Sequence, residues 1–162
     1  MDYLTRKYEE LMEKHSDTRV QNWLFMDSPV SNHLYSTNLL IYGIIPLTKV
    51  YAKQKAFELT TIIRAYNVSQ VAACCYLIYM MSTSGWIQGD YSFGCQTIDY
   101  SSAPNAVRLV KAFYLVYWLK FYELFETVLF GLRKKFRQIS PLHVYHHASS
   151  LSLAFLAAKF IG

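Results

Sequence analysis

Residues 67–87 form an apolar run without a charged side chain, and this run restricts the possible folds more than any other feature. A helix of about 20 residues is roughly 30 Å long, which matches the hydrocarbon thickness of a bilayer. Hydrophobic residues make up 53% of the 162 residues, and the mean hydropathy of +0.12 is too apolar for an ordinary soluble domain. The sequence therefore predicts an all-α membrane protein with a transmembrane helix at this run.

Three further segments are predicted to cross the membrane, at residues 34–50, 106–132 and 140–161. The first of them is interrupted by Pro46 and is just long enough to span. Ser140 and Pro141 predict where the last helix begins, because Ser is a favoured N-cap and Pro suits the first helical position. We therefore expect a polytopic membrane domain over residues 34–162.

The charged loops predict how these four helices are oriented. Basic clusters at 49–64 and 133–137 should face the cytoplasm, and the loop at 85–105, which has no Lys or Arg, should face the opposite side. Residues 1–33 then form a non-cytoplasmic N-terminal segment, which can include a short amphipathic helix. The formal net charge is +5, but the charges flank apolar segments without a basic–aromatic groove pattern, so nucleic acid is excluded as a partner.

Three of the five histidines lie together in the sequence H-V-Y-H-H. On a helix, His143, His146 and His147 have the spacing i, i+3 and i+4, which places them on one face of an apolar segment. The positive end of the helix and burial both favour the neutral imidazole. A neutral imidazole can attack an acyl carbon, accept a proton or bind a metal. These three residues are therefore the predicted reactive groups inside the membrane.

The preceding segment carries a polar face of its own. Lys120, Glu123, Glu126 and Thr127 share one side of the predicted helix, opposite an aromatic side. Because a charge in hydrocarbon costs about 2.5 kcal/mol or more, this side should face protein or water, and the simplest packing sets it against the histidines. Lys120 and Glu123 can form an ion pair, which is either structural or part of the chemistry. A carboxylate such as Glu123 or Glu126 could fix the tautomer of an imidazole.

Residues 120–127 read K-F-Y-E-L-F-E-T, L-R-K-K follows at 132–135, and the histidine motif ends the series at 143–147. In order and spacing these motifs resemble those of the elongases of very long chain fatty acids, which have K-x-x-E-x-x-D-T, then L-R-K-K, then H-x-x-H-H. The sequence Y-N-x-x-Q-V at 66–71 is also similar to that family. The resemblance covers roughly residues 27–162.

This resemblance implies an enzyme of the endoplasmic reticulum membrane with seven helices, six of them around a narrow cavity. Such an enzyme condenses a long-chain acyl-CoA with malonyl-CoA, giving a 3-ketoacyl-CoA, CoA and carbon dioxide. The resemblance implies that His146 accepts the acyl group, while His143 and His147 shape the site or move protons. Both CoA compounds are substrates, and neither a cofactor nor a bound metal is expected. The lipid bilayer, other enzymes of the elongation cycle or a second copy of the chain are the expected partners.

Two further groups of residues receive roles in this interpretation. The polar face before the histidines joins the predicted catalytic site through Lys120, Glu123 and Glu126. The basic residues that follow are candidates for binding CoA phosphates, although loop topology alone also explains their charge and is the preferred interpretation. These basic residues are Arg133, Lys134, Lys135 and Arg137.

The chain departs from the family pattern in two ways. Glu126 stands where the family usually has Asp, so its carboxylate lies one methylene further from the backbone. Only four of the seven implied helices are predicted here. We therefore expect the N-terminal portion of an elongase, which is inactive or weakly active by itself because part of the pocket is missing. Cys95 would face the oxidising lumen without a partner in this chain.

Three other interpretations are open. A membrane di-iron desaturase or hydroxylase also uses H-x-x-H-H, although such sites need several histidine motifs and this chain has one. A catalytically inactive, truncated elongase fragment could retain the motifs and bind full-length partners. Cys74 or Cys75 could act as a nucleophile, but no His or charge on their segment activates them, and packing explains the adjacent pair better.

Overall fold

The computed structural model describes residues 2–26, 53 and 55–161, and its regular elements are helical. The α-helices are α1 (Asp2–His15), α4 (Thr60–Met81), α5 (Pro104–Glu123), α6 (Phe125–Leu132) and α7 (Pro141–Phe160). Short helical turns lie at Thr18–Val20 (η1), Ser82–Trp86 (η4) and Phe136–Gln138 (η5). The described residues contain no strand, so the prediction of an all-α chain is confirmed over this part of the sequence.

Whether these helices can cross a membrane is a separate question from whether they form. Among residues 2–26, 53 and 55–161, no helix combines the length and the apolar character that crossing a bilayer requires. The predicted span at 34–50 lies outside the described residues. Helices do form at the other three predicted positions, but their bounds differ from the prediction.

Helix α4 begins at Thr60, well before the predicted start at residue 67. An apolar run marks where side chains leave water, whereas backbone hydrogen bonding also continues through polar residues. At its other end α4 passes into the π-helical turn η4, where Gly85 has a φ of +131°. A Cβ atom on Gly85 would lie 2.8 Å from Cδ2 of Tyr91. The turn therefore requires glycine both for its backbone conformation and for this close approach.

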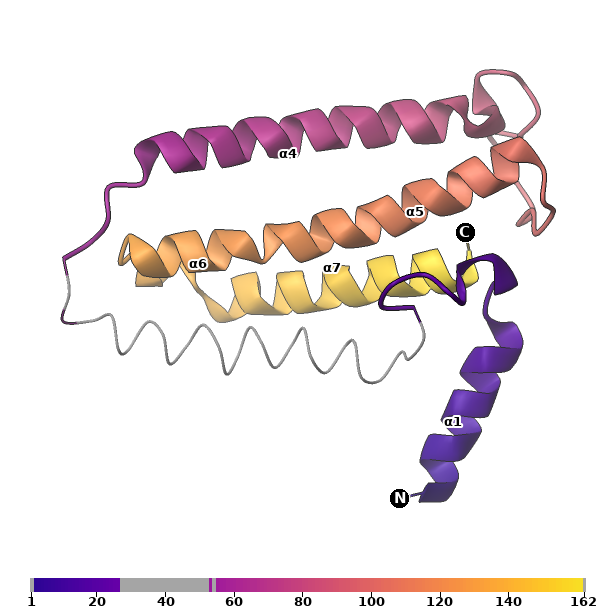
Figure 1. The fold of residues 1–162 in the computed structure, drawn as a ribbon, viewed down its shortest axis with the longest axis horizontal. Helices are drawn as coiled ribbons and strands as arrows, with labels where there is room; N and C mark the ends of the chain where they lie inside the picture. The colour runs from indigo at the N-terminus through magenta and orange to yellow at the C-terminus, as the bar shows by residue number, and fades with distance from the viewer. Residues whose placement is uncertain (1, 27–52, 54, 162) are drawn as a thin grey trace.

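The segment predicted as one helix over 106–132 is two helices, α5 and α6, which meet at Leu124. The amide of Leu124 donates to the carbonyl of Phe121, and the amide of Thr127 donates to the carbonyl of Leu124, both at 3.2 Å. These i to i−3 bonds make a tighter turn than an α-helix and interrupt its regular bonding. The prediction of an unbroken helix was therefore wrong at this residue, although α6 continues roughly along the direction of α5 (Figure 1).

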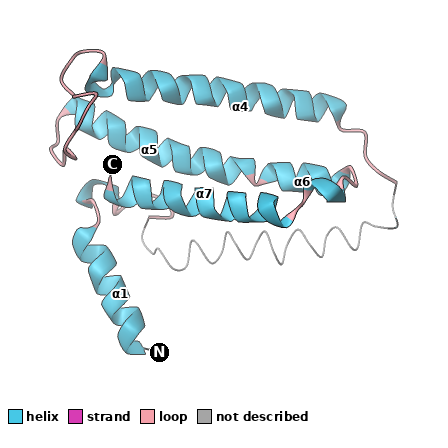
Figure 2. Cartoon of the chain, turned by 180° about the vertical axis from the view of Figure 1, so that it is seen from behind, coloured by secondary structure: helices cyan, strands magenta, loops and turns pink. Residues whose placement is uncertain are grey.

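Helix α5 lies between α4 and α7 and contacts both (Figure 1, and from behind in Figure 2). Between α5 and α7, the ring of Tyr117 packs edge-on against Phe155 at a centroid distance of 5.9 Å. Val110 and Leu151 are buried in the same core. Full burial of an apolar side chain of this size contributes about 1.5–3 kcal/mol. This core holds α7 against α5 and so fixes how the polar residues of the two helices face each other.

The N-terminal segment docks onto the end of α7. The amide of Asp17 donates to the carbonyl of Lys159 at 2.9 Å, and the buried ammonium of Lys159 donates to the carbonyl of Met26. Arg19 forms an ion pair with Asp17 and donates to the carbonyl of Ser101 at 2.7 Å. These contacts join the C-terminal end of α7 to the loop before α5. The short helix expected near the N-terminus is present as α1, which projects away from the other helices (Figure 1).

Candidate active site

Helix α7 begins where the sequence predicted, and its first turn positions His143. Ser140 is the N-cap residue: its backbone is extended, and its Oγ accepts a hydrogen bond from the amide of His143 at 3.2 Å. Pro141 follows in the first turn, where its missing amide hydrogen leaves no donor unpaired. The cap and the proline therefore fix the backbone of His143 at the end of α7 that lies beside α6 (Figure 1).

The three histidines of α7 differ in exposure. His147 is 4% exposed, His143 is half-buried, and His146 is exposed. A helix turns by about 100° per residue, so His143 and His147 are about 40° apart around the axis, whereas His146 and His147 are about 100° apart. The expectation that all three are enclosed against the preceding polar face was therefore wrong for His146, which lies on a part of the α7 surface that the described residues leave exposed.

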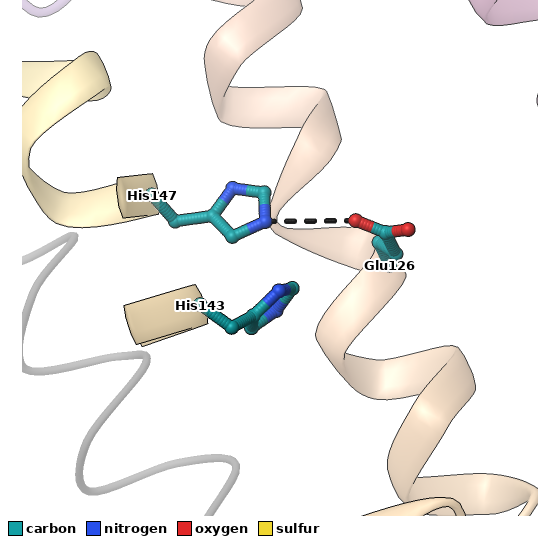
Figure 3. A group of neighbouring side chains, drawn as sticks. All are labelled: Glu126, His143 and His147. Carbon is teal, nitrogen blue, oxygen red and sulfur yellow. Dashed lines mark ion pairs between the residues drawn. The ribbon is translucent and has the colours of Figure 1, made fainter. Parts of the chain in front are cut away.

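Two side chains of α6 face the inner two imidazoles. Oε2 of Glu126 lies 3.6 Å from Nε2 of His147, and Oγ1 of Thr127 lies 3.0 Å from Nε2 of His143. The rings of His143 and His147 meet edge to face, with their centroids 4.4 Å apart. Figure 3 shows both rings extending from α7 toward the helix that carries Glu126. Helix α6 therefore offers a carboxylate to one ring and a hydroxyl to the other.

The two nitrogens of His147 have different surroundings. Nε2 faces Glu126 at a distance suited to an ion pair but longer than a hydrogen bond, and the Glu126 side chain is 40% exposed. Nδ1 is buried and has no hydrogen-bond partner among the described residues. In Figure 3 it is the nitrogen on the ring edge that points away from His143. Glu126 therefore places a carboxylate beside Nε2 of His147, and its part in fixing the tautomer of the ring stays a prediction.

Lys120 and Glu123 form the predicted ion pair near the end of α5. The ammonium lies 2.9 Å from each carboxylate oxygen, and both side chains are partly buried. A spacing of i, i+3 on one helix brings the two charges together without help from another element. The pairing is confirmed. A direct part of either residue in the chemistry stays a prediction.

Helix α4 adds a polar cluster that was not predicted from the sequence. The hydroxyl of Tyr66 accepts a hydrogen bond from the side-chain amide of Gln70 at 2.8 Å, and the Tyr66 ring packs against Tyr122 at 5.1 Å. Ser69 Oγ lies 3.0 Å from the hydroxyl of Tyr122. Oε1 of Gln70 is buried without a partner in the described part of the chain. Tyr66, Ser69 and Gln70 have the spacing i, i+3 and i+4, which places them on one face of a helix and could have identified the cluster.

The basic residues after α6 lie where its last turn closes. The amide of Lys135 donates to the carbonyl of Phe130 and the amide of Lys134 to the carbonyl of Gly131, while Lys134 has a φ of +55°. This is a Schellman arrangement, with a lysine where glycine is usual. Lys135 and Arg137 are exposed, and Arg133 and Lys134 are half-buried. Such positions give a phosphate access to Lys135 and Arg137, but CoA binding by the group stays a prediction.

Glu126, His143 and His147 also form a group that could hold a metal ion. One potential ligand atom from each lies within 4.8 Å of the others. Imidazole nitrogen and carboxylate oxygen are suitable ligands for zinc and iron. A di-iron centre needs more ligands than these three residues supply, so the geometry gives less support to the desaturase interpretation than to chemistry by the imidazoles themselves.

The three cysteines are free, and all are exposed. Cys74 and Cys75 lie on α4. Both side chains are exposed among the described residues, so the explanation of this pair by packing was wrong. The reason is that, of the long helices described, α4 packs mainly against α5. Cys95 lies in the loop before α5 and forms no disulfide with Cys74 or Cys75.

Comparison with known proteins gives the family of the chain. Residues 24–162 match the family described as ELO: GNS1/SUR4 family. Very long chain fatty acid elongase 1 of Homo sapiens is 38% identical over 151 residues, which cover 91% of this chain and 52% of that protein. Very long chain fatty acid elongase 7 of Rattus norvegicus is 42% identical over 135 residues, which cover 83% of this chain and 47% of that protein.

A very long chain fatty acid elongase of Aedes aegypti is 37% identical over 154 residues, covering 92% of this chain and 42% of that protein. The chain thus spans about half the length of the curated relatives it matches. The family match includes α4 to α7, which carry every residue of the candidate site. This chain therefore belongs to the ELO (GNS1/SUR4) family.

Proposed function

We propose that this chain provides the histidine site of a fatty acid elongase, at which a long-chain acyl-CoA condenses with malonyl-CoA. The main support is the arrangement of α6 against α7. Glu126 and Thr127 face His147 and His143, while His146 stays exposed beside this pair. Membership of the ELO family and the similarity to proteins named very long chain fatty acid elongases support the same reaction.

In the proposed first step, an imidazole nitrogen of His146 attacks the thioester carbonyl of the acyl-CoA. A carbon–nitrogen bond forms, the carbon–sulfur bond breaks, and the imidazole proton leaves with the CoA thiolate as free CoA. The exposure of His146 supports this role, because a nucleophile must reach the substrate. The product is an acyl group carried on the imidazole.

In the second step, malonyl-CoA loses carbon dioxide, and the electron pair of the broken carbon–carbon bond becomes an enolate. The enolate carbon attacks the acyl carbonyl, the bond to His146 breaks, and a 3-ketoacyl-CoA is released. The imidazole then takes up one proton, which restores its starting state. His147 lies beside His146, with ring centroids 5.7 Å apart, and its Nε2 faces Glu126 at 3.6 Å. This pair is suited to proton movement near the reacting imidazole.

We propose that the protein acts in the endoplasmic reticulum membrane as a multi-pass protein. The amide of Phe57 donates to the carbonyl of Leu132 at 3.2 Å, which brings the basic segment before α4 close to the basic residues after α6. The loop before α5 and the docked N-terminal segment lie at the opposite end of the helices (Figure 1). Basic segments gathered at one end support the predicted orientation, in which that end is cytoplasmic.

Acyl transfer to the protein tests the proposed function directly. We expect a long-chain acyl-CoA, incubated with the protein in detergent micelles, to acylate His146, and mass spectrometry of the peptide around residues 143–147 to locate the group. Hydroxylamine should remove it, because acyl-imidazoles are reactive. Addition of labelled malonyl-CoA should convert the adduct into a longer, labelled 3-ketoacyl-CoA.

His146→Ala should abolish both the adduct and the labelled product, because the proposed nucleophile is missing. His15→Ala is the matched control, since His15 is an exposed histidine on α1 outside the candidate site. An adduct that persists in His146→Ala would assign the acyl group to another residue. Absence of adduct and product in the unaltered protein and in both variants would favour the interpretation of this chain as a catalytically inactive fragment.

A metal-dependent function is the second candidate, and the group formed by Glu126, His143 and His147 is the observation that favours it. Metal analysis of protein purified without chelators distinguishes the two functions. Stoichiometric iron that is lost in His147→Ala would favour an oxygenase. Protein that acylates His146 without stoichiometric metal would favour the condensing reaction.

A further inference from the structure

Thr127 is buried in α6, with 2% of its surface exposed, and its Oγ1 lies 3.0 Å from Nε2 of His143. We propose that Thr127 is a positioning residue, whose hydroxyl fixes the ring orientation of His143 and so holds the wall of the site beside the reacting histidine. This inference rests on the proposed function and adds a residue to it. It concerns a hydrogen bond between two helices that no spacing within one helix predicts.

The other contacts of His143 leave its ring orientation undetermined. Its backbone is fixed by Ser140, and its ring packs against Phe130 at 5.5 Å and against His147 at 4.4 Å. A rotation of the imidazole by 180° about the Cβ–Cγ bond exchanges Nε2 with Cε1 but keeps nearly the same shape. Ring packing therefore tolerates both orientations, whereas a hydroxyl distinguishes nitrogen from carbon. The Thr127 hydroxyl supplies this distinction.

Thr127 is well suited to this function. Its side chain is β-branched, so it has few rotamers in a helix, and the hydroxyl direction is correspondingly restricted. A buried hydroxyl without a partner is costly, which favours the bond to His143 over an open site. A hydroxyl can donate or accept, so it holds Nε2 in either tautomer of the ring. The positioning therefore does not depend on which ring nitrogen carries the proton.

The neighbouring contact shows why this orientation matters for the proposed reaction. Glu126 and Thr127 are consecutive residues, and they face His147 and His143, whose rings touch. Turning His143 would change the edge that it presents to His147. His147 in turn lies against His146, the proposed nucleophile. Thr127 acts through His143 on the surroundings of His146, without contacting the substrate itself.

Carbethoxylation of histidines by diethyl pyrocarbonate tests this inference without any CoA substrate. The reagent attacks an unprotonated ring nitrogen, and mass spectrometry of fragment ions gives a separate rate for each histidine. Thr127→Val keeps the shape of the side chain and removes the hydroxyl. We expect the rate at His143 to rise about fivefold, the equivalent of the roughly 1 kcal/mol that one hydrogen bond contributes. The rate at the exposed His146 should stay within about twofold.

Thr127→Ser is the matched variant, because it retains the hydroxyl. We expect it to restore the rate at His143 to within about twofold of the unaltered protein, and to restore the yield of acyl adduct if Thr127→Val lowers it. Equal rates at His143 in Thr127→Val and the unaltered protein would overturn the inference. A rate in Thr127→Ser equal to that in Thr127→Val would also overturn it, because volume rather than the hydroxyl would then be responsible.

Nitrogen-15 NMR of the unaltered protein gives a second measurement, which remains informative if Thr127→Val does not fold. A hydrogen-bonded Nε2 of His143 should give ring nitrogen shifts that stay separate from those of an exposed histidine such as His15. Ring nitrogen shifts for His143 that match those of His15 would overturn the inference. Neither measurement requires acyl transfer, so failure of the proposed function would appear separately, as a missing adduct at His146.

Discussion

Ser140→Ala tests whether the N-cap of α7 holds the first turn that carries His143. The first amides of a helix have no partner within it, and here the amide of His143 uses Ser140 Oγ at 3.2 Å. Loss of a Ser cap costs about 0.5–2 kcal/mol. Because this bond is long and Ser140 is only half-buried, we expect the lower part of that range, about 0.5–1 kcal/mol.

Amide hydrogen exchange measures this cost at one position. A loss of about 0.5–1 kcal/mol corresponds to a roughly two- to fivefold fall in protection of the His143 amide. The amide of Val144 is an internal control, because it donates to the backbone carbonyl of Ser140, which alanine retains, at 3.1 Å. Ser140→Asp keeps an acceptor oxygen and should preserve the protection of His143. Equal exchange at His143 in Ser140→Ala and the unaltered protein would refute this account of the cap.

Two further predictions concern the loop that follows α4. Gly85→Ala should destabilise η4 by about 1–3 kcal/mol, because an L-residue is strained at a φ of +131° and its Cβ would meet the ring of Tyr91. A thermal unfolding temperature equal to that of the unaltered protein would contradict this. Hydrogen bonds from the side chain and backbone of Ser101 lower the pKa of Asp99 below its ordinary value of 3.8. The stabilisation they give is present above that value and is lost as pH falls through the lowered pKa. The Ser101 amide should titrate in NMR below pH 3.8 and lose this step in Asp99→Asn.

The parts of the fold that follow local rules were predictable from the sequence. Ser140 and Pro141 marked the start of α7 because capping depends on residues that are adjacent in the chain. The break at Leu124 gave no such signal, since neither Gly nor Pro lies at that position. It depends on the i to i−3 bonds that the backbone forms there, which the pattern of apolar residues does not encode.

The candidate site likewise contains contacts that were predictable from the sequence and contacts that were not. The pair Lys120–Glu123 was predictable because both residues lie on one helix at i, i+3. The contact between Thr127 and His143 joins two helices, so it depends on how α6 and α7 pack, and a sequence pattern within either helix cannot give it. The exposure of His146 likewise depends on which neighbours cover α7.

Glu126 shows how a departure from the family motif can be accommodated. Its longer side chain, which is 40% exposed, brings a carboxylate oxygen to 3.6 Å from Nε2 of His147. At that distance the interaction is electrostatic, and in a partly exposed site it is screened by water. The short, directional contact to the histidines is instead made by the adjacent Thr127, at 3.0 Å. The carboxylate and the hydroxyl therefore act differently: Glu126 sets the charge beside the imidazoles, and Thr127 sets their geometry.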